Sequence, residues 1–255
     1  LGVQVGWRTN IEPGEGFRER LWNERQRLDI RYQLDKGRMI GVDFLVPKDP
    51  ILRWDWIEPE KGRYDFSRLD RFMALAAEYG YRVKLVLPTF GGRVPDWLLA
   101  ERPESVVRDD QGKADFLLNG GTFAHDFMGP IPRDGEWYHA RAVNLADEPT
   151  RAAFARYVAA VGRHCREQGY RERILAVTVD VFHAQRNWRA PAGADLRAFV
   201  VEQYGRVAEI ARAAFAPVPL DLEVTDGEAH FVDTDLSAHE WRSVGLTEVV
   251  DIPGV

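Results

Sequence analysis

The sequence predicts an α/β fold, a (β/α)8 TIM barrel that lacks its last two βα units in this chain. Strand-like and helix-like segments alternate along the chain, and the helical segments are long enough to connect parallel strands. No glycine-rich phosphate motif follows the first strand, where "LGVQVGW" runs into "RTNIEPGEG". This absence disfavours a doubly wound nucleotide-binding sheet. We expect one barrel domain over residues 1–255, carried by a longer polypeptide, because the chain opens and stops on strand-like residues.

Strands are expected where short apolar runs rich in β-branched residues stand between turn residues. The expected strands are residues 1–7, 39–46, 81–88, 173–182, 219–225 and 247–255. Helices are expected where apolar residues recur every three or four positions. The expected helices are residues 16–37, 67–80, 147–169 and 194–215.

Two of these helices have recognisable ends. Asp147 is expected to cap the amino end of one helix, which Gly169 terminates. Ser67 is expected to cap an earlier helix, which stops at Gly80.

Composition excludes several classes of function. The net charge of −6, with no run of Lys and Arg, argues against nucleic-acid binding. No apolar run reaches the roughly 18 residues of a membrane span, and no signal peptide opens the chain. The single Cys165 cannot form an internal disulfide, and the histidines lack metal-binding spacing. We expect no metal and no cofactor, while the cellular compartment and self-association stay undetermined.

Alternation along the strands directs charges to one face of the expected sheet. Asp43, Lys84, Asp180 and Glu223 each lie opposite the apolar face of their own strand. Charges collected in a barrel interior must pair or take part in chemistry, because an unpaired buried charge is destabilising. Two interpretations remain open, a structural network between Lys84 and the carboxylates or an acidic floor of a site.

A longer segment carries a family resemblance. "RWDWIEPEKGRYDFSRLDRF", followed by "PT", "PDWL" and "PE", resembles the second and third βα units of glycoside hydrolase clan A, closest to the β-galactosidases of family 42. "AVNLADEPTRAAFARYV" resembles the family's segment before its third helix. The similarity covers roughly residues 39–180. It implies a TIM barrel that acts on a β-linked glycoside.

The chain departs from the family at the fourth strand. There the family carries Asn-Glu, the Glu being the general acid/base, and this sequence has Val181 and Phe182. The family's nucleophile lies on a seventh strand, which the expected fold does not include. Three explanations are open. The acid has moved to Asp180 with Glu223 as second carboxylate; the protein is a non-catalytic glycan-binding relative; or the alignment is shifted by one or two residues.

Sugar contacts are expected at the end of the second strand. Aromatic faces stack on sugar rings, and carboxylates accept bonds from hydroxyl groups, which suits Trp54, Asp55 and Trp56. In an extended segment the two tryptophans share one face, so either the pair or Asp55 faces the sugar. The alternative is that one tryptophan packs under the next helix. His183, just beyond Asp180, is the fourth expected substrate contact.

Overall fold

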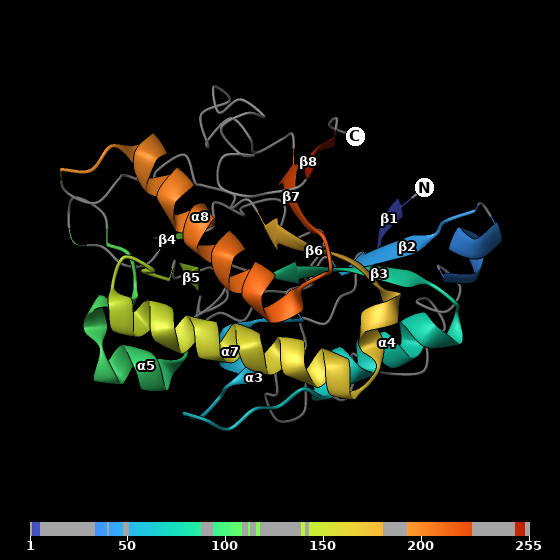
Figure 1. Ribbon diagram of the computed structural model, residues 1–255, viewed down its shortest axis with the longest axis horizontal. Helices are drawn as coiled ribbons and strands as arrows, with labels where there is room; N and C mark the ends of the chain where they lie inside the picture. Colours follow the sequence, from blue (N-terminus) through green and yellow to red (C-terminus); the bar gives the residue numbers. More distant parts are fainter. Residues whose placement is uncertain are drawn as a thin grey trace.

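The structure, a computed structural model, describes residues 2–5, 34–39, 41–47, 51–87, 94–108, 112, 116–117, 139–140, 143–180, 193–225 and 248–252. Within these residues, six parallel strands form one sheet in the order β1-β2-β3-β6-β7-β8 (Figure 1). The strands are β1 Gly2–Val5, β2 Phe44–Pro47, β3 Arg82–Leu87, β6 Ile174–Asp180, β7 Leu220–Thr225 and β8 Glu248–Ile252. Five of them lie inside a segment that the sequence predicted to be a strand, and β2 extends one residue beyond the predicted range of 39–46.

Helices fill the connections between the strands. They are α3 Trp54–Ile57, α4 Ser67–Glu78, α5 Asp96–Glu101, α7 Glu148–Glu167 and α8 Leu196–Phe215, with short 3-10 turns η1 Pro103–Ser105 and η3 Tyr170–Arg173. Residues 34–39 are also helical. A separate antiparallel pair joins β4 Phe116–Leu117 to β5 His139–Ala140.

The strand predicted from residue 39 begins later than expected. Residues 34–39 are helical, and β2 starts at Phe44. Gly41 separates the two with a φ of +80°, a left-handed backbone that does not continue into a strand. Asp43 consequently lies before β2, is exposed, and does not take the interior position predicted for it.

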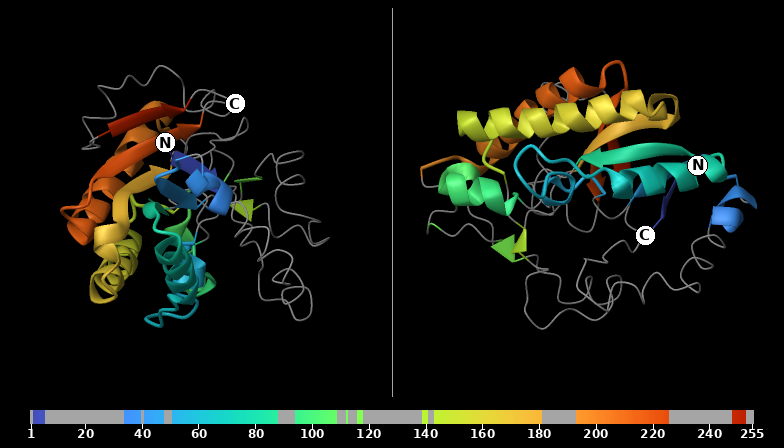
Figure 2. Two further views of the ribbon diagram at one scale, coloured as in Figure 1. Left: turned by 90° about the vertical axis from the view of Figure 1, so that its right-hand side faces the viewer. Right: turned by 90° about the horizontal axis from the view of Figure 1, so that it is seen from below.

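The order of the strands shows how the sheet is wound. Within this sheet the strands are hydrogen-bonded to one another in their chain order, all in parallel, and β4 and β5 lie outside it. Right-handed crossovers then place the connecting helices on one face. Figure 2 shows α4, α7 and α8 together on one side of the sheet, as in a barrel and unlike a doubly wound fold.

Closure of a barrel is not seen among the described strands. β1 and β8 stand at the two ends of the sheet and do not pair with each other. The prediction of parallel α/β units is confirmed, and the arrangement in the described part of the chain is an open arc of sequential strands.

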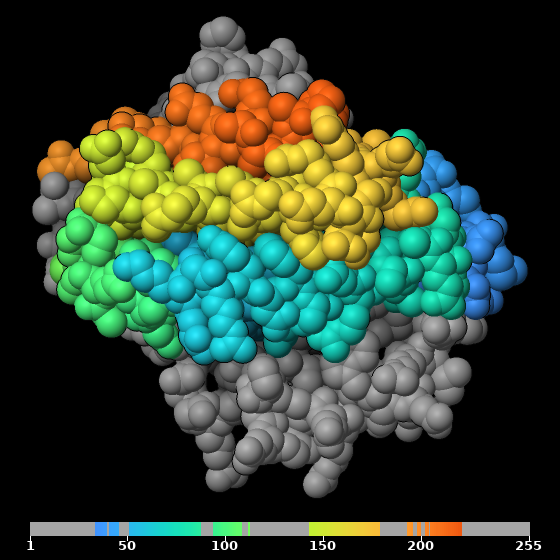
Figure 3. Space-filling model, turned by 60° about the horizontal axis from the view of Figure 1, so that its bottom comes forward, coloured from blue at the N-terminus to red at the C-terminus, as the bar shows by residue number. Residues whose placement is uncertain are grey.

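The core lies between the sheet and the outer helices. Leu85, Val177 and Leu220 are register neighbours across three strands, and all three are buried. Figure 3 shows the outer side of this layer, where α8, α7 and α4 form adjacent bands. The predicted apolar face of β3 is confirmed, because Val83, Leu85 and Leu87 are fully buried while Lys84 is half-buried.

The predicted ends of α7 are confirmed, and so is the end of α4 at Gly80, which has a φ of +73°, whereas the predicted cap of α4 is corrected. Asp147 caps α7, its side chain accepting a bond from the Thr150 N–H at 3.0 Å, and Gly169 follows with a φ of +71°. At α4, Ser67 is the first helical residue rather than the cap. Its N–H donates to Asp65 Oδ1 at 2.9 Å, so Asp65 supplies the acceptor.

Candidate active site at the carboxyl ends of the strands

Two predicted catalytic residues are brought together by strand register. Asp180 is the last residue of β6, and its partner in the pairing of β6 with β7 is Glu223. Neighbouring strands lie about 4.8 Å apart, so the two backbones are adjacent. Both residues lie toward the carboxyl ends of their strands, the edge at which barrel enzymes hold their catalytic groups.

Residues of the interior face of the sheet precede this pair, toward the amino ends of the strands. Val86 and Thr178 are register partners one row before Asp180, and Thr178 is fully buried. Lys84 lies one further row toward the amino end, with its Nζ 5.3 Å from the centre of the Phe44 ring. Lys84 therefore belongs to the same face as Thr178, as the alternation predicted. Since Asp43 lies at the opposite edge, it is not a member of this group.

Trp54 does not occupy the extended segment that the sequence suggested. Residues 54–57 form the short helix α3, so Trp54 and Trp56 do not share a face. The Trp54 side chain is 2% exposed. Its ring stacks on Tyr157 at 5.5 Å and meets the edge of Phe154 at 5.4 Å. The alternative, that one tryptophan packs under the next helix, is correct in that Trp54 is buried, but the helix that covers Trp54 is α7 rather than the next helix, α4.

Asp55 and Trp56 lie nearer the surface and are both held by arginines. Arg53 forms a two-pronged ion pair with Asp55, its Nε 2.8 Å from Oδ1. The guanidinium groups of Arg53 and Arg68 lie over the Trp56 ring, at 4.1 Å and 3.7 Å from its centre. A sugar that contacts this segment would meet a charged arginine cluster as well as an aromatic ring.

Glu58 is the polar centre of the same segment. Its carboxylate is buried and accepts bonds from Trp54 Nε1 at 2.8 Å and from the Gly62 N–H at 2.9 Å. The Glu58 carbonyl accepts a bond from Trp97 Nε1 at 3.1 Å. Glu58 thus joins α3 and the following turn through its carboxylate and α5 through its carbonyl, which gives the "EPEKG" motif a structural role.

A second polar cluster closes the long connection between β3 and α7. We call residues 102–107 and 143–147 the neck, because they pair where this connection returns to the helix. Val106 and Val143 form an antiparallel bridge, and the Asn144 N–H donates to the Ser105 carbonyl at 2.8 Å. The sequence predicted only the Asp147 cap. The rest depends on contacts between residues about forty positions apart, for which periodicity gives no signal.

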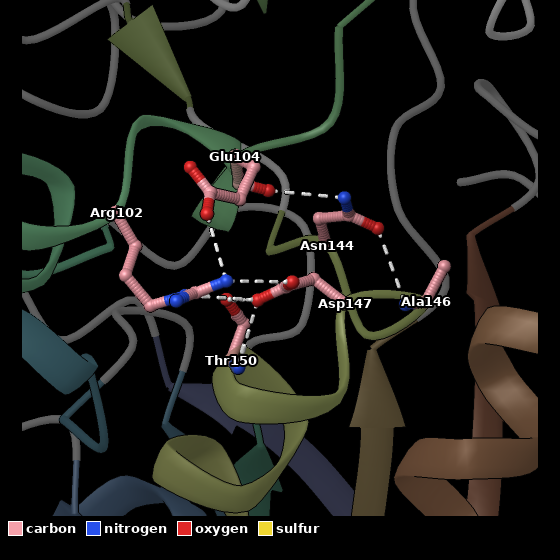
Figure 4. Close-up of polar contacts among 6 residues, drawn as sticks. All are labelled: Arg102, Glu104, Asn144, Ala146, Asp147 and Thr150. Carbon is pink, nitrogen blue, oxygen red and sulfur yellow. Dashed lines mark hydrogen bonds and ion pairs between the residues drawn. The ribbon is translucent and has the colours of Figure 1, made fainter.

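Arg102 ties the neck to the start of α7 (Figure 4). Its guanidinium lies 3.0 Å from Asp147 Oδ1 and 2.7 Å from Glu104 Oε1. Burial disfavours the Asp147 charge, but bonds from Arg102 and Thr150 outweigh burial and lower the pKa of Asp147. The Asp147 side chain therefore serves both as the cap of α7 and as the ion-pair partner of Arg102.

The lowered pKa of Asp147 predicts a loss of stability in acid. A carboxyl whose pKa is depressed by folding stabilises the protein above its unfolded pKa, and that stabilisation disappears as pH falls through the folded value. We expect Asp147→Asn, which keeps a capping acceptor, to be less stable than wild type at pH 7. The difference should shrink below about pH 4. Urea unfolding of both proteins from pH 2.5 to 7 measures it, and a constant difference across this range would contradict the prediction.

Other reactive side chains are accounted for as follows. Burial raises the pKa of the Cys165 thiol to about 12, so it remains protonated and is not a nucleophile. His183 lies outside the described residues. Among the residues that the structure describes, no group of three or more His, Cys, Asp or Glu gathers to hold a metal ion.

None of the helices described combines the length and apolar character needed to cross a membrane.

Comparison with known families matches the part of the chain that contains α3 and α4. The profile of the glycoside hydrolase family 42 β-galactosidases matches residues 33–122. An exo-β-D-glucosaminidase of Thermococcus kodakarensis is 32% identical over 123 residues, which are 42% of this chain and 15% of the relative. A β-galactosidase of Halorubrum lacusprofundi is 27% identical over 172 residues, covering 62% of this chain and 22% of the relative. The chain thus spans less than a quarter of the length of these two relatives.

Solved structures share the fold over nearly the whole chain. A β-galactosidase from the psychrophilic Marinomonas ef1 superposes with a TM-score of 0.56, 14% identity, and coverage of 90% of this chain and 39% of that chain. A β-galactosidase from Bacillus circulans sp. alkalophilus gives a TM-score of 0.56, 11% identity, and coverage of 92% and 39%. The resemblance predicted from the sequence is confirmed over part of the family's length.

Proposed function

We propose that this chain, a partial-length relative of the family 42 β-galactosidases, takes part in hydrolysing a β-linked glycoside, with Asp180 as acid and Glu223 as second carboxylate. The relationship to glycosidases that act on β-linked sugars supports the reaction class. The register pairing of Asp180 with Glu223 at the carboxyl ends of adjacent strands carries the assignment of residues.

Glycoside hydrolysis requires two carboxyl groups with different tasks. One donates a proton to the leaving oxygen, and the other attacks the sugar or activates a water molecule. Asp180 takes the first task here, because the sequence has Phe182 where the resemblance places the acid, and a phenyl ring transfers no proton. Glu223 takes the second task as its register neighbour.

The sugar contacts are proposed on the segment that follows β2 and on the segment that follows β6. Asp55 and Trp56 are partly exposed, and both remain in the proposal. Trp54 supports them from the core rather than by contact, since its ring is covered by Phe154 and Tyr157. His183, three positions after Asp180, remains in the proposal from its place in the sequence.

A second candidate function is glycan binding without catalysis. The observation that favours it is the pair Val181 and Phe182, which stands where the resembling family carries its Asn-Glu pair. A protein of this kind would keep the sugar contacts and show no turnover.

Turnover of a panel of aryl β-glycosides, including a galactoside and a glucosaminide, separates these functions. Wild type is expected to release aryl alcohol, and Asp180→Asn is expected to lower kcat about 10²-fold, a typical contribution of a general acid. Asp43→Asn is the matched control, because Asp43 lies exposed at the amino end of β2 and should leave kcat unchanged. Glycan binding without turnover by wild type would favour the second function. Equal kcat values for wild type and Asp180→Asn would remove Asp180 from the proposal.

A further inference from the structure

The neck is tied at several points along its length. In addition to the Val106–Val143 bridge, the Asn144 side chain donates from Nδ2 to the Glu104 carbonyl at 3.0 Å. Figure 1 shows α5, β4 and β5 on the side toward which the arrowheads of β3 and β6 point. The neck, which lies between α5 and the start of α7, therefore belongs to the carboxyl edge of the sheet. That edge also carries the Asp180–Glu223 pair.

The Gln203 side chain of α8 reaches into the neck. Gln203 is 2% exposed, and its Oε1 accepts a bond from the Leu145 N–H at 3.0 Å. Leu145 lies just before α7, so its N–H has no place in that helix's own hydrogen bonding. The bond joins two places that are 58 positions apart in the chain.

The amide nitrogen of Gln203 shows that packing alone does not explain why a glutamine stands at this position. Gln203 Nε2 is buried and has no hydrogen-bond partner among the described residues, and the same holds for Ser105 Oγ in the neck. A buried donor without a partner is destabilising, and an apolar side chain of similar volume would avoid this penalty. The bond to Leu145 is thus the favourable contact that the amide provides and a leucine would not.

We infer that Gln203 is a positioning residue, which fixes the neck relative to the strand end that bears Asp180. The chain order supports this coupling, because among the described elements α8 is the next after β6, which ends at Asp180. Gln203 touches no reacting atom in this role. It acts through Leu145 on the neck, which lies at the same edge of the sheet as the proposed sugar site, so its loss is expected to weaken substrate binding rather than the chemical step. The identity of the substrate rests on the proposed function. The coupling between Gln203 and the neck does not depend on it.

Hydrogen exchange tests the coupling without any substrate. In the full chain carrying Gln203→Leu, peptides that cover residues 143–147 are expected to exchange about tenfold faster, because the Leu145 amide loses its acceptor. Residues 153–165 of α7 should exchange as in wild type. Val207→Ala is the matched control, since Val207 lies one turn further along α8, is equally buried and makes no bond to the neck through its side chain. Unchanged exchange of residues 143–147 in Gln203→Leu would overturn the inference.

Kinetics with an aryl β-glycoside tests the consequence for the site. Gln203→Leu is expected to raise KM about fivefold with kcat within about twofold of wild type, the pattern of lost binding. Gln203→Glu retains an acceptor for the Leu145 N–H and should restore both the exchange and KM toward wild type. A fall in kcat with KM unchanged would overturn the positioning role. Absence of turnover in wild type would overturn the proposed function and the kinetic part, while the exchange experiment would still decide the coupling.

Discussion

Trp54→Ala is expected to lower the free energy of unfolding by about 3–5 kcal/mol, the range for removing a buried tryptophan. The ring is almost fully buried between Phe154 and Tyr157, and its removal leaves a cavity between α3 and α7. Glu58 also loses the donor that lies 2.8 Å from its Oε2. An uncompensated buried carboxylate adds to the cavity term. Urea unfolding at pH 7 followed by circular dichroism measures the change.

Two companion variants separate the contributions. Trp54→Phe keeps an aromatic ring but removes the N–H and part of the indole volume, so it should lose less than Trp54→Ala, about 1–3 kcal/mol. Trp56→Ala is the matched control on the same short helix, because its partly exposed ring contacts mainly the Arg53 and Arg68 guanidinium groups. Such contacts contribute about 0.5–1 kcal/mol each at exposed sites. Equal losses for Trp54→Ala and Trp56→Ala would show that Trp54 is not the core residue of this segment.

Gly162→Ala is expected to destabilise the protein by about 2 kcal/mol, although alanine is the better helix former. A Cβ at position 162 would lie 2.5 Å from the Ala214 carbonyl oxygen of α8, and this atom belongs to backbone. The steric penalty of about 3 kcal/mol exceeds the gain of about 1 kcal/mol in helix propensity. The two helices would have to move apart to admit one methyl group.

The opposite substitution, alanine to glycine, measures the contribution of helix propensity in the same helix. Ala159 is exposed on α7, so Ala159→Gly should cost only about 1 kcal/mol. Denaturant unfolding of both variants at one pH gives the comparison. A stabilised Gly162→Ala would mean that α7 and α8 approach less closely than the structure shows.

Much of the fold follows from local patterns in the sequence. β3 was predictable because Val83, Leu85 and Leu87 alternate with Arg82, Lys84 and Val86, and the buried row that the first three form is observed. Asp147 was predictable as a cap because its acceptor lies three residues before the N–H it binds. The placement of Asp180 and Glu223 on adjacent parallel strands also follows from the pattern, and the register of β6 with β7 makes their backbones partners.

The features that were missed depend on contacts between distant residues. "WDWI" was expected to be extended, but the segment is a short helix. Trp54 packs in the core against Tyr157, which lies more than a hundred positions later in the chain. The neck depends on Arg102 reaching Asp147 and on Gln203 reaching Leu145. No periodicity in a single segment reports such pairs. Asp43 was misplaced because the apolar run around it hides the left-handed turn at Gly41.

The agreement between strand order and chain order has a consequence for how the protein is made. Each new strand of the sheet finds its neighbour already synthesised, so the sheet can grow in the direction of translation. The longest interval between the synthesis of two paired strands is that between β3 and β6, during which residues 88–173 are synthesised. During that interval the edge of β3 exposes unpaired backbone groups, and an exposed edge of this kind promotes aggregation. A ribosome that pauses within residues 88–173 should therefore give more aggregated nascent chain than one that pauses after β6.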